Sequence, residues 1–221
     1  SDGSQATAYG VVQGIRACLN EVYDNPDLKG RMIALQGIGA VGTQVLNYLV
    51  EAGAIVTISD IDQERTRLVA AKYNTRIVST EEIHSLRVDV FCPCALGNVL
   101  NDRTIPELRC KIVCGSANNQ LGDNLHGDLL QARGILYAPD YIVNAGGLLS
   151  NLDSLNPGGF NHQRAMEQVS RLYNSMENII AISKEQNIPT YRAADVLAEQ
   201  RIASIRHLNS LANGNEGLKE K

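Results

Sequence analysis

The sequence contains no long hydrophobic run and no concentration of basic residues. Its apolar stretches are far shorter than the ~20 residues that a membrane-spanning helix needs. No charged-then-apolar signal segment opens the chain. Lysine and arginine are scattered along it, and the net charge is −4. These absences argue against a membrane protein and against a nucleic-acid-binding protein.

Several signatures of catalysis and metal binding are missing as well. No G-x-S-x-G, H-E-x-x-H or Walker lysine motif occurs. The four histidines show no paired ligand spacing, so each is interpreted as a surface or capping residue. The five cysteines are an odd number and no N-x-S/T sequon is present, which favours free thiols and a cytoplasmic location. Cys92-x-Cys94 and Cys110-x₃-Cys114 could hold zinc, but buried or cofactor-lining thiols fit this spacing better.

What the sequence does contain is a regular alternation of strand and helix patterns. An amphipathic helix is expected over 4–23, and short apolar runs typical of buried strands follow it. The spacings of Ser79 with Glu82 and of Thr104 with Glu107 are those of capping boxes at helix starts. Strands separated by helices at this interval indicate βαβ units, so we predict an α/β fold with a doubly wound, mostly parallel sheet. The predicted strands are 32–36, 55–59, 76–78, 88–92, 111–114 and 135–137.

Beyond residue 145 the strand pattern ends and a 3.6-residue period begins. It predicts one long helix through Ala165 and Ile180, and a second helix after Pro189. Ser175 and Met176 lie on the long helix, where core packing is the favoured role and contact with a substrate side chain is the alternative. We expect a dinucleotide-binding domain over 1–150, C-terminal helices packed on it over 151–212, and a flexible tail over 213–221.

The segment MIALQGIGAVGTQVL, residues 32–46, places Gly37, Gly39 and Gly42 at the spacing G-x-G-x-x-G between a predicted strand and a predicted helix. Gly37 would permit a tight turn, Gly39 would let a pyrophosphate approach the backbone, and Gly42 would let the helix pack closely on the strand. The helix N-terminus would add unpaired N–H groups and a positive dipole end. These features predict a dinucleotide site. The alternative is a purely structural turn.

Asp60 ends the second predicted strand, 18 residues after Gly42. A carboxylate at this position can accept hydrogen bonds from the adenosine ribose, and it would repel a 2′-phosphate. The pattern therefore predicts NAD rather than NADP as the cofactor. Arg65 could weaken this preference, but it lies well inside the next helix. The alternative role for Asp60 is helix capping.

Three longer segments resemble a known family. They read FCPCALG at 91–97, GSANNQL at 115–121 and YAPDYIVNAGG at 137–147, and TAYGV at 7–11 precedes them. In this order they are similar to the cofactor domain of amino-acid dehydrogenases, in the branch that acts on leucine, valine, phenylalanine and tryptophan. The resemblance covers nearly the whole chain. It implies NAD as cofactor, an amino acid and its 2-oxo acid as substrates, and a homo-oligomer.

The resemblance also implies roles for particular residues. Thr7 and Asn118 would contact the nicotinamide carboxamide, and the backbone of 94–96 would line the nicotinamide ribose. Asn144 would face the carboxylate or amino group of the substrate, and Asp140 could orient Asn144 or cap a helix. These segments follow predicted strand ends, where ligands collect in an open α/β sheet. The expected cofactor-binding residues are Thr7, Gly37, Gly39, Ala40, Val41, Gly42, Asp60, Ile61, Cys94, Ala95, Leu96, Ala117, Asn118 and Asn144.

The sequence departs from the family pattern in one respect. The substrate domain, with a catalytic lysine, a second lysine for the substrate carboxylate and a catalytic aspartate, has no counterpart among these residues. We therefore expect the cofactor domain of an oxidoreductase that reversibly deaminates an apolar L-amino acid to its 2-oxo acid and ammonia, inactive without that domain. One alternative is a stand-alone, non-catalytic NAD-binding module. Another is a Rossmann dehydrogenase for a folate or a hydroxy acid, against which the three long segments argue. Residues 156–160 look like a short insertion.

Overall fold

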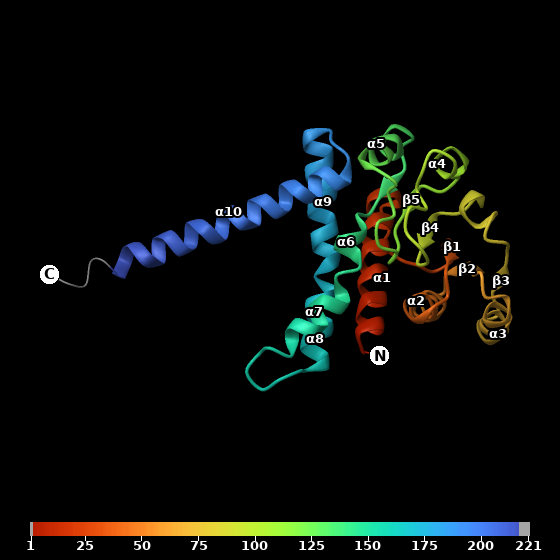
Figure 1. Cartoon of the computed structure of the whole chain (residues 1–221), viewed down its shortest axis with the longest axis horizontal. Coiled ribbons are helices and arrows are strands. Elements are labelled where there is room, and N and C mark those ends of the chain that lie inside the picture. Colours follow the sequence, from red (N-terminus) through yellow and green to blue (C-terminus); the bar gives the residue numbers. More distant parts are fainter. Residues whose placement is uncertain (1, 217–221) are drawn as a thin grey trace.

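The computed structural model describes residues 2–216 (Figure 1). Within them, six parallel strands form one sheet in the order β3-β2-β1-β4-β5-β6. The strands are β1 (Met32–Gln36), β2 (Ile55–Ser59), β3 (Arg76–Ile77), β4 (Val90–Pro93), β5 (Ile112–Val113) and β6 (Leu136–Tyr137). The helices are α1 (Asp2–Tyr23), α2 (Ala40–Glu51), α3 (Gln63–Tyr73), the 3₁₀ turn η1 (Ile83–Ser85), α4 (Thr104–Glu107), α5 (Asn124–Ala132), α6 (Asp140–Val143), α7 (Gly146–Asp153), α8 (His162–Ser170), α9 (Leu172–Gln186) and α10 (Thr190–Glu216). The predicted doubly wound α/β fold is confirmed.

β1 is the central strand because its side chains are apolar on both faces. Ala34 and Leu35, which point to opposite faces of the sheet, are both completely buried, as expected in a parallel sheet that helices cover on both sides. The register places Gln36, the last residue of β1, beside Ser59 of β2 and Pro93 of β4. The three strands therefore end together, and the segments that follow them start at one edge of the sheet. The strand order reverses between β1 and β4, which is where ligands bind in such sheets.

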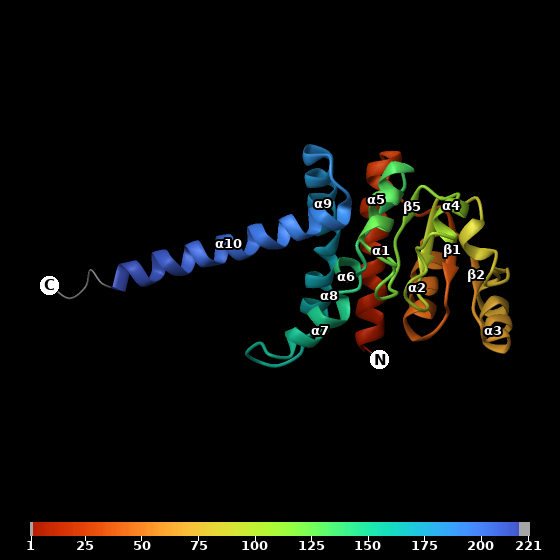
Figure 2. The ribbon, with the colours of Figure 1, turned by 45° about the horizontal axis from the view of Figure 1, so that its top comes forward.

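α1 connects the sheet to the C-terminal helices. It packs against α2, α7 and α9, and it lies between α9 and the strands in both views (Figures 1 and 2). Its side chains Ile15 and Leu19 are completely buried in the main hydrophobic core. This helix therefore fixes the position of α7 relative to the carboxyl edge of the sheet.

An ion pair holds the connection between α7 and α8, which contains the expected insertion. The carboxylate of Asp153 is completely buried and accepts hydrogen bonds from Arg164 Nε at 2.5 Å and Nη2 at 2.9 Å. It also accepts one from the Asn161 N–H at 2.7 Å. Arg164 Nη2 additionally donates to the Gly159 carbonyl at 2.7 Å. The segment 156–160 is thus anchored at its base by two side chains.

Neither predicted capping box forms in full. The Glu82 carboxylate does accept from the Ser79 N–H at 3.3 Å, but the Ser79 hydroxyl donates to the same carboxylate at 2.7 Å instead of capping a backbone N–H, and η1 begins only after Glu82. Thr104, in contrast, is the first residue of α4 rather than its cap. Its hydroxyl donates back to the carbonyl of Val99, and Glu107 turns away to contact a histidine. A tertiary contact therefore replaces the local one.

The C-terminal region also differs from the expectation. The single long helix is divided at Arg171, whose N–H bonds to the Gln168 carbonyl three residues earlier at 3.2 Å, a tighter turn than an α-helix makes. α10 packs on the domain through Leu197, but residues 198–206 are exposed and the helix extends away (Figure 1). It continues to Glu216, inside the segment expected to be a tail, and residues 217–221 lie outside the described part. Over the described residues, no helix is both long and apolar enough to cross a bilayer.

Candidate functional site

The three glycines form the turn between β1 and α2, and each has a different structural role. Gly37 has a φ of +92°, and a Cβ on it would lie 2.8 Å from the Cβ and the nitrogen of Ala95. A Cβ on Gly42 would lie 2.0 Å from the Gly37 carbonyl oxygen, so α2 can reach this position only with glycine there. A Cβ on Gly39 would meet no described atom within 4 Å. Protein packing therefore requires two of the glycines, and the third leaves open space.

α2 presents the uncapped N-terminus that an anion site needs. Gly39 is its N-cap, and no side chain among the described residues caps it. The expected positions Ala40 and Val41 form the first turn, which contains no acidic residue. The first N–H groups of a helix lack intrahelical acceptors and carry partial positive charge, which attracts phosphate.

Asp60 joins the end of β2 to the glycine turn. Its Oδ2 accepts a hydrogen bond from the Ile38 N–H at 2.8 Å, and its Oδ1 accepts one from the Asp62 N–H at 2.9 Å. A carboxylate offers about four lone-pair sites, so each oxygen keeps one for a further donor. The side chain is thus held in place by two backbone groups while it remains able to accept from a ribose hydroxyl.

Arg65, the residue that could favour a 2′-phosphate, is paired with an acid in this structure. Its Nη2 donates to Asp62 Oδ2 at 2.7 Å, and this hydrogen bond raises the pKa of the guanidinium. The pair is exposed to solvent, and such pairs contribute little energy and exchange partners readily. Arg65 lines the same cavity as Asp60, but in this structure its guanidinium contacts Asp62.

A cavity of about 470 Å³ lies along these residues. Its apolar side chains include Ile61 and Leu96, which are 85 % and 82 % exposed. Apolar walls with a few fixed polar groups are typical of sites for small molecules. Of the expected cofactor-binding residues, the lining brings together Gly37, Gly39, Asp60, Ile61, Cys94, Ala95 and Leu96. The others, Thr7, Ala40, Val41, Gly42, Ala117, Asn118 and Asn144, lie outside this lining.

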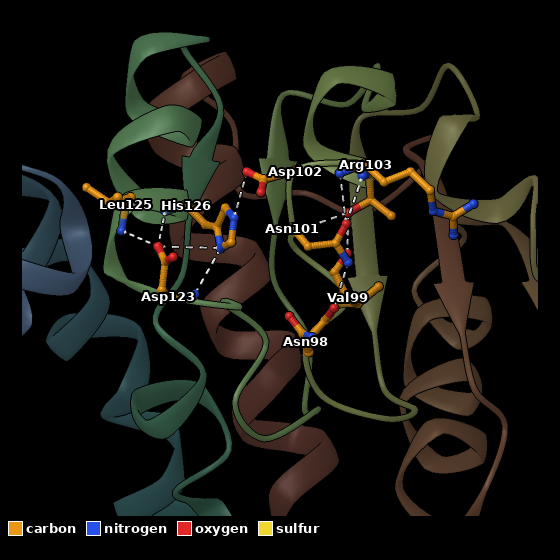
Figure 3. Close-up of polar contacts among 9 residues, drawn as sticks. Asn98, Val99, Asn101, Asp102, Arg103, Asp123, Leu125 and His126 are labelled. Carbon is orange, nitrogen blue, oxygen red and sulfur yellow. Dashed lines mark hydrogen bonds and ion pairs between the residues drawn. The ribbon is translucent and has the colours of Figure 1, made fainter.

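One wall of the cavity is a loop that Asn101 holds in shape. The side-chain oxygen of Asn101 accepts hydrogen bonds from the N–H groups of Arg103 at 3.0 Å and Thr104 at 3.1 Å. Its amide donates to the Asn98 carbonyl at 2.8 Å, as Figure 3 shows. The sequence reasoning missed Asn101. An asparagine three residues before a helix start is the local signal for such a cap.

His126 supports the same loop from the α5 side. Its Nδ1 accepts from the Asp123 N–H at 2.9 Å, and its Nε2 lies 3.1 Å from Asp102 Oδ1 (Figure 3). Because Nδ1 is an acceptor, the neutral ring carries its proton on Nε2 and donates it to Asp102. His126 and Asp123 form a capping box at the start of α5. The predicted capping role is confirmed, although the residue is only 7 % exposed.

The prediction that His84 is a surface or capping residue is wrong. The side chain is 3 % exposed and lines the cavity. Its Nε2 contacts the carboxylate of Glu107, and this hydrogen bond lowers the pKa of Glu107. Sequence spacing gave no signal for this contact, because the two residues meet only through the packing of η1 on α4.

Two predicted amides meet beyond the carboxyl edge of the sheet. Asn144 Nδ2 donates to Asn118 Oδ1 at 2.6 Å. A Cβ on Gly97 would lie 2.5 Å from the Asn118 carbonyl oxygen, so the loop after β4 touches the loop after β5. Ala117 is 3 % exposed, and its N–H donates to the Pro93 carbonyl at 2.9 Å. Asn118 and Asn144 are thus brought together, while Ala117 fixes the loop that carries Asn118.

Thr7 reaches this region from α1. Its hydroxyl donates to the Gly3 carbonyl at 2.9 Å and lies 2.7 Å from the position of a Cβ on Gly147. A Cβ on Gly146 would lie only 2.1 Å from the Ala6 carbonyl oxygen. The start of α7 therefore packs directly on the backbone of α1, which places Thr7 next to the segment that follows Asn144.

Asp140 does not orient the Asn144 side chain. Its Oδ2 accepts from the Gln120 N–H at 2.9 Å and its Oδ1 from the N–H of Tyr141 at 2.6 Å. Only its backbone carbonyl binds the Asn144 N–H, at 2.9 Å. The carboxylate instead ties the first residue of α6 to the loop after β5, so its role is structural.

The two residues considered for substrate contact on α9 face elsewhere. Met176 is completely buried in the main core, which confirms the packing interpretation. The Ser175 hydroxyl accepts from Arg201 Nη2 of α10 at 3.2 Å. Leu148, in contrast, is 62 % exposed in the first turn of α7, four residues after Asn144. The sequence reasoning missed it, because an apolar residue in an amphipathic pattern is expected to be core.

The sheet order, the glycine turn, the acid after β2 and the cavity between them define a Rossmann-type domain. One further finding identifies the family. The model for "Glutamate/Leucine/Phenylalanine/Valine dehydrogenase" matches residues 1–63 and 58–209. The chain therefore belongs to this amino-acid dehydrogenase family, as its three long segments indicated.

Its relatives include dehydrogenases of several amino acids. The chain is 41 % identical over 220 residues to leucine dehydrogenase of Geobacillus stearothermophilus, covering 99 % of the chain and 59 % of that enzyme. It is 42 % identical over 212 residues to phenylalanine dehydrogenase of Thermoactinomyces intermedius, covering 95 % and 57 %. The crystal structure of L-tryptophan dehydrogenase from Nostoc punctiforme superposes with a TM-score of 0.89 at 38 % identity, covering 92 % and 61 %. The chain thus spans about three fifths of the length of these relatives.

Proposed function

We infer that this chain binds NAD, with the adenosine ribose at Asp60 and the pyrophosphate at the glycine turn. The observation that carries the proposal is the Asp60–Ile38 hydrogen bond of 2.8 Å beside the cavity. It ties the ribose-binding carboxylate to the turn that would hold the phosphates. The space next to Gly39, which a Cβ would fill, fits a pyrophosphate in contact with the backbone.

The residues beyond the carboxyl edge would hold the nicotinamide end. Asn118 can donate from its amide nitrogen to the carboxamide, since its Oδ1 already accepts from Asn144. Asn144 donates one side-chain N–H in this bond. Its side-chain oxygen remains available to accept a hydrogen bond from a substrate amino group. The coenzyme, when bound, supplies the hydride chemistry, and the protein supplies position and orientation.

The proposed reaction is the reversible oxidative deamination of an apolar L-amino acid to its 2-oxo acid and ammonia. The leucine and phenylalanine dehydrogenases among the relatives support this class of substrate. So does Leu148, an exposed apolar side chain close in sequence to Asn144. We propose that the catalytic lysine and aspartate belong to a substrate domain outside these 221 residues, so this chain alone is inactive.

A second candidate is a non-catalytic NAD-binding module, in which the glycine turn and Asp60 bind the coenzyme without a reaction. Both candidates bind NAD, so only a measurement of catalytic activity distinguishes them. The chain would be expressed together with the substrate domain of a leucine dehydrogenase relative, and NADH formation would be followed with leucine and with phenylalanine. Turnover that depends on both parts supports the enzyme, and its absence with NAD bound favours the module.

The cofactor proposal is tested by calorimetry with NAD and NADP on the wild type, on Asp60→Ser and on Glu64→Ser. Glu64 is an exposed acid in the first turn of α3 that does not line the cavity, so its replacement controls for net charge. A hydrogen bond to a charged group contributes about 1.5–3 kcal/mol. We therefore expect Asp60→Ser to lower the affinity for NAD by roughly 10- to 150-fold. It should also reduce the preference for NAD over NADP. An unchanged preference in Asp60→Ser would refute the assignment.

A further inference from the structure

Two cysteine thiols lie together at the end of β4, next to the glycine turn. The Sγ atoms of Cys92 and Cys94 are 3.7 Å apart, because residues two apart along a strand share a face. Cys92 is completely buried. Cys94 is half-buried and lines the cavity together with Gly37. Cys94 is therefore the partly exposed member of the pair at the cavity, and Cys92 lies behind it in the main core.

The surroundings make Cys94 the more reactive of the two. Hydrogen bonds from the Cys92 thiol and from Ser116 lower the pKa of Cys94. The same hydrogen bond, together with burial, raises the pKa of Cys92. Cys94 is also the member of the pair that lines the cavity, whereas Cys92 is completely buried, so Cys94 reacts first, as the nucleophilic thiolate.

We propose that Cys92 and Cys94 are a modification site at which a peroxide forms a reversible disulfide that weakens coenzyme binding. In the first step the Cys94 thiolate attacks one peroxide oxygen. The S–O bond forms, the O–O bond breaks, and the other oxygen leaves as hydroxide, which takes up a proton to give water. In the second step the Cys92 sulfur attacks the sulfenic sulfur of Cys94, the S–O bond breaks, and the proton of Cys92 leaves with the hydroxyl as water. The thiols lose two electrons and the peroxide gains them.

The chain geometry allows this bond at the cost of a local shift. Residues two apart in an extended strand have Cα atoms roughly 6.6 Å apart, near the upper end of the ~4.4–6.8 Å that disulfides span. The sulfurs must approach from 3.7 Å to about 2.05 Å. Cys94 follows Pro93, the last residue of β4, so its movement disturbs the hydrogen bond from its own N–H to the Gln36 carbonyl and leaves the earlier pairs of β4 in place.

The shift reaches the glycine turn through two contacts. The Cys94 N–H donates to the Gln36 carbonyl at 2.7 Å. The next residue, Ala95, lies against Gly37, where a Cβ would be 2.8 Å from the Ala95 nitrogen. Moving Cys94 toward Cys92 therefore displaces the support of the turn. Because coupling between two sites is reciprocal, bound coenzyme also protects the thiols from oxidation.

The other three cysteines are the alternative sites of oxidation. All five cysteines lie within the described residues as free thiols. Cys114 is the neighbour of the pair, but it is completely buried and its Sγ contacts the Val11 carbonyl at 3.6 Å. Cys110 belongs to a different hydrophobic cluster, so Cys110→Ser is a matched control that keeps the pair intact.

The first experiment tests, in the absence of coenzyme, whether the Cys92–Cys94 disulfide forms. The 221-residue chain is treated with an equimolar amount of hydrogen peroxide, and intact mass and peptide mapping follow. We expect the loss of two hydrogen atoms, located in the Cys92–Cys94 peptide and reversed by dithiothreitol, in the wild type and in Cys110→Ser. Cys92→Ala should instead stop at a sulfenic acid on Cys94 that dimedone traps, and a melting curve checks its fold. A disulfide that involves Cys114 overturns the proposal, and so does a wild-type chain in which Cys92 and Cys94 stay unmodified. This test uses the wild type and does not depend on any variant.

The second experiment measures the effect on binding, and here the inference depends on the proposed NAD function. Calorimetry compares NAD binding to the reduced and to the oxidised chain. Coupling between sites is usually about 5- to 150-fold in affinity, and we expect the Kd to rise within this range and to recover after reduction. Equal affinities with the bond formed refute the coupling. If the reduced chain fails to bind NAD, the proposed function fails, and the mass measurement alone decides the thiol chemistry.

Discussion

Two glycines of the β1–α2 turn allow coenzyme binding and folding stability to be changed separately. In Gly39→Ala, the new Cβ meets no described atom within 4 Å, so the protein has room for it. It projects into the space assigned to the pyrophosphate, which makes the variant defective in binding. In Gly42→Ala, the Cβ lies 2.0 Å from the Gly37 carbonyl oxygen, so α2 or the turn must move.

The expected magnitudes follow from these contacts. Replacing glycine by alanine at a tolerated backbone conformation stabilises by about 0.4–1 kcal/mol, and the poorer N-cap propensity of alanine offsets this gain. The Tm of Gly39→Ala should therefore stay within roughly 4 °C of the wild type. Losing one backbone bond to the pyrophosphate, about 1.5–3 kcal/mol, raises the Kd for NAD by roughly 10- to 150-fold. Overpacking in Gly42→Ala costs about 1–3 kcal/mol, which lowers the Tm by roughly 2–12 °C.

Calorimetry with NAD and thermal unfolding followed by circular dichroism measure the two quantities on the same samples. Gly134→Ala serves as the control glycine, because its Cβ would also lie in open space but far along the chain from the turn. Its φ of +66° predicts some loss of stability without loss of binding. Wild-type affinity for NAD in Gly39→Ala would refute the placement of the pyrophosphate. An unchanged Tm in Gly42→Ala would refute the close packing of α2.

Three further predictions concern other parts of the structure. Asn101→Ala should speed hydrogen exchange in the loop around it and weaken NAD binding, because three side-chain hydrogen bonds are lost. Unchanged exchange would contradict the role of Asn101 in holding this loop. Met176→Ala should lower stability by about 2–5 kcal/mol, whereas Leu148→Ala, at an exposed position, should leave the melting temperature unchanged. Asp153→Asn should be destabilising at neutral pH. The Arg164 hydrogen bond lowers the pKa of Asp153, so its stabilisation is present above the ordinary carboxyl pKa of about 3.9. The difference between wild type and variant in urea titrations should therefore shrink as the pH falls through the lowered value.

Much of the fold follows from local patterns. The strand predicted at 32–36 and the one at 55–59 agree with β1 and β2 at both ends, because each is a short apolar run bounded by residues that end strands. The glycine turn and Asp60 were also found from spacing alone. Predictions were less accurate where a tertiary contact competed with a local one. Thr104 has the spacing of a cap, but Asn101 occupies that role and Thr104 bonds back to Val99.

The composition of the cavity was harder to predict than the fold. His84 and Glu107 are far apart in sequence, and neither belongs to a recognisable motif. They meet only because η1 packs on α4 beside β1. Leu148 was missed for the opposite reason. An apolar side chain in a helical pattern is normally buried, and only the packing of α7 on α1 shows that this one is exposed.

The sequence by itself determined the alternation of strands and helices, the glycine turn and the acid after the second strand, since these depend on neighbours along the chain. It also determined the family, through three long segments. Only the tertiary structure decided that Asn118 bonds Asn144, that Asn101 shapes a wall of the cavity, and that the Cys92 and Cys94 thiols stand one behind the other beside Gly37. The physical reason is that strand order and register bring distant loops to one edge of the sheet, and no local propensity encodes which loops will meet there.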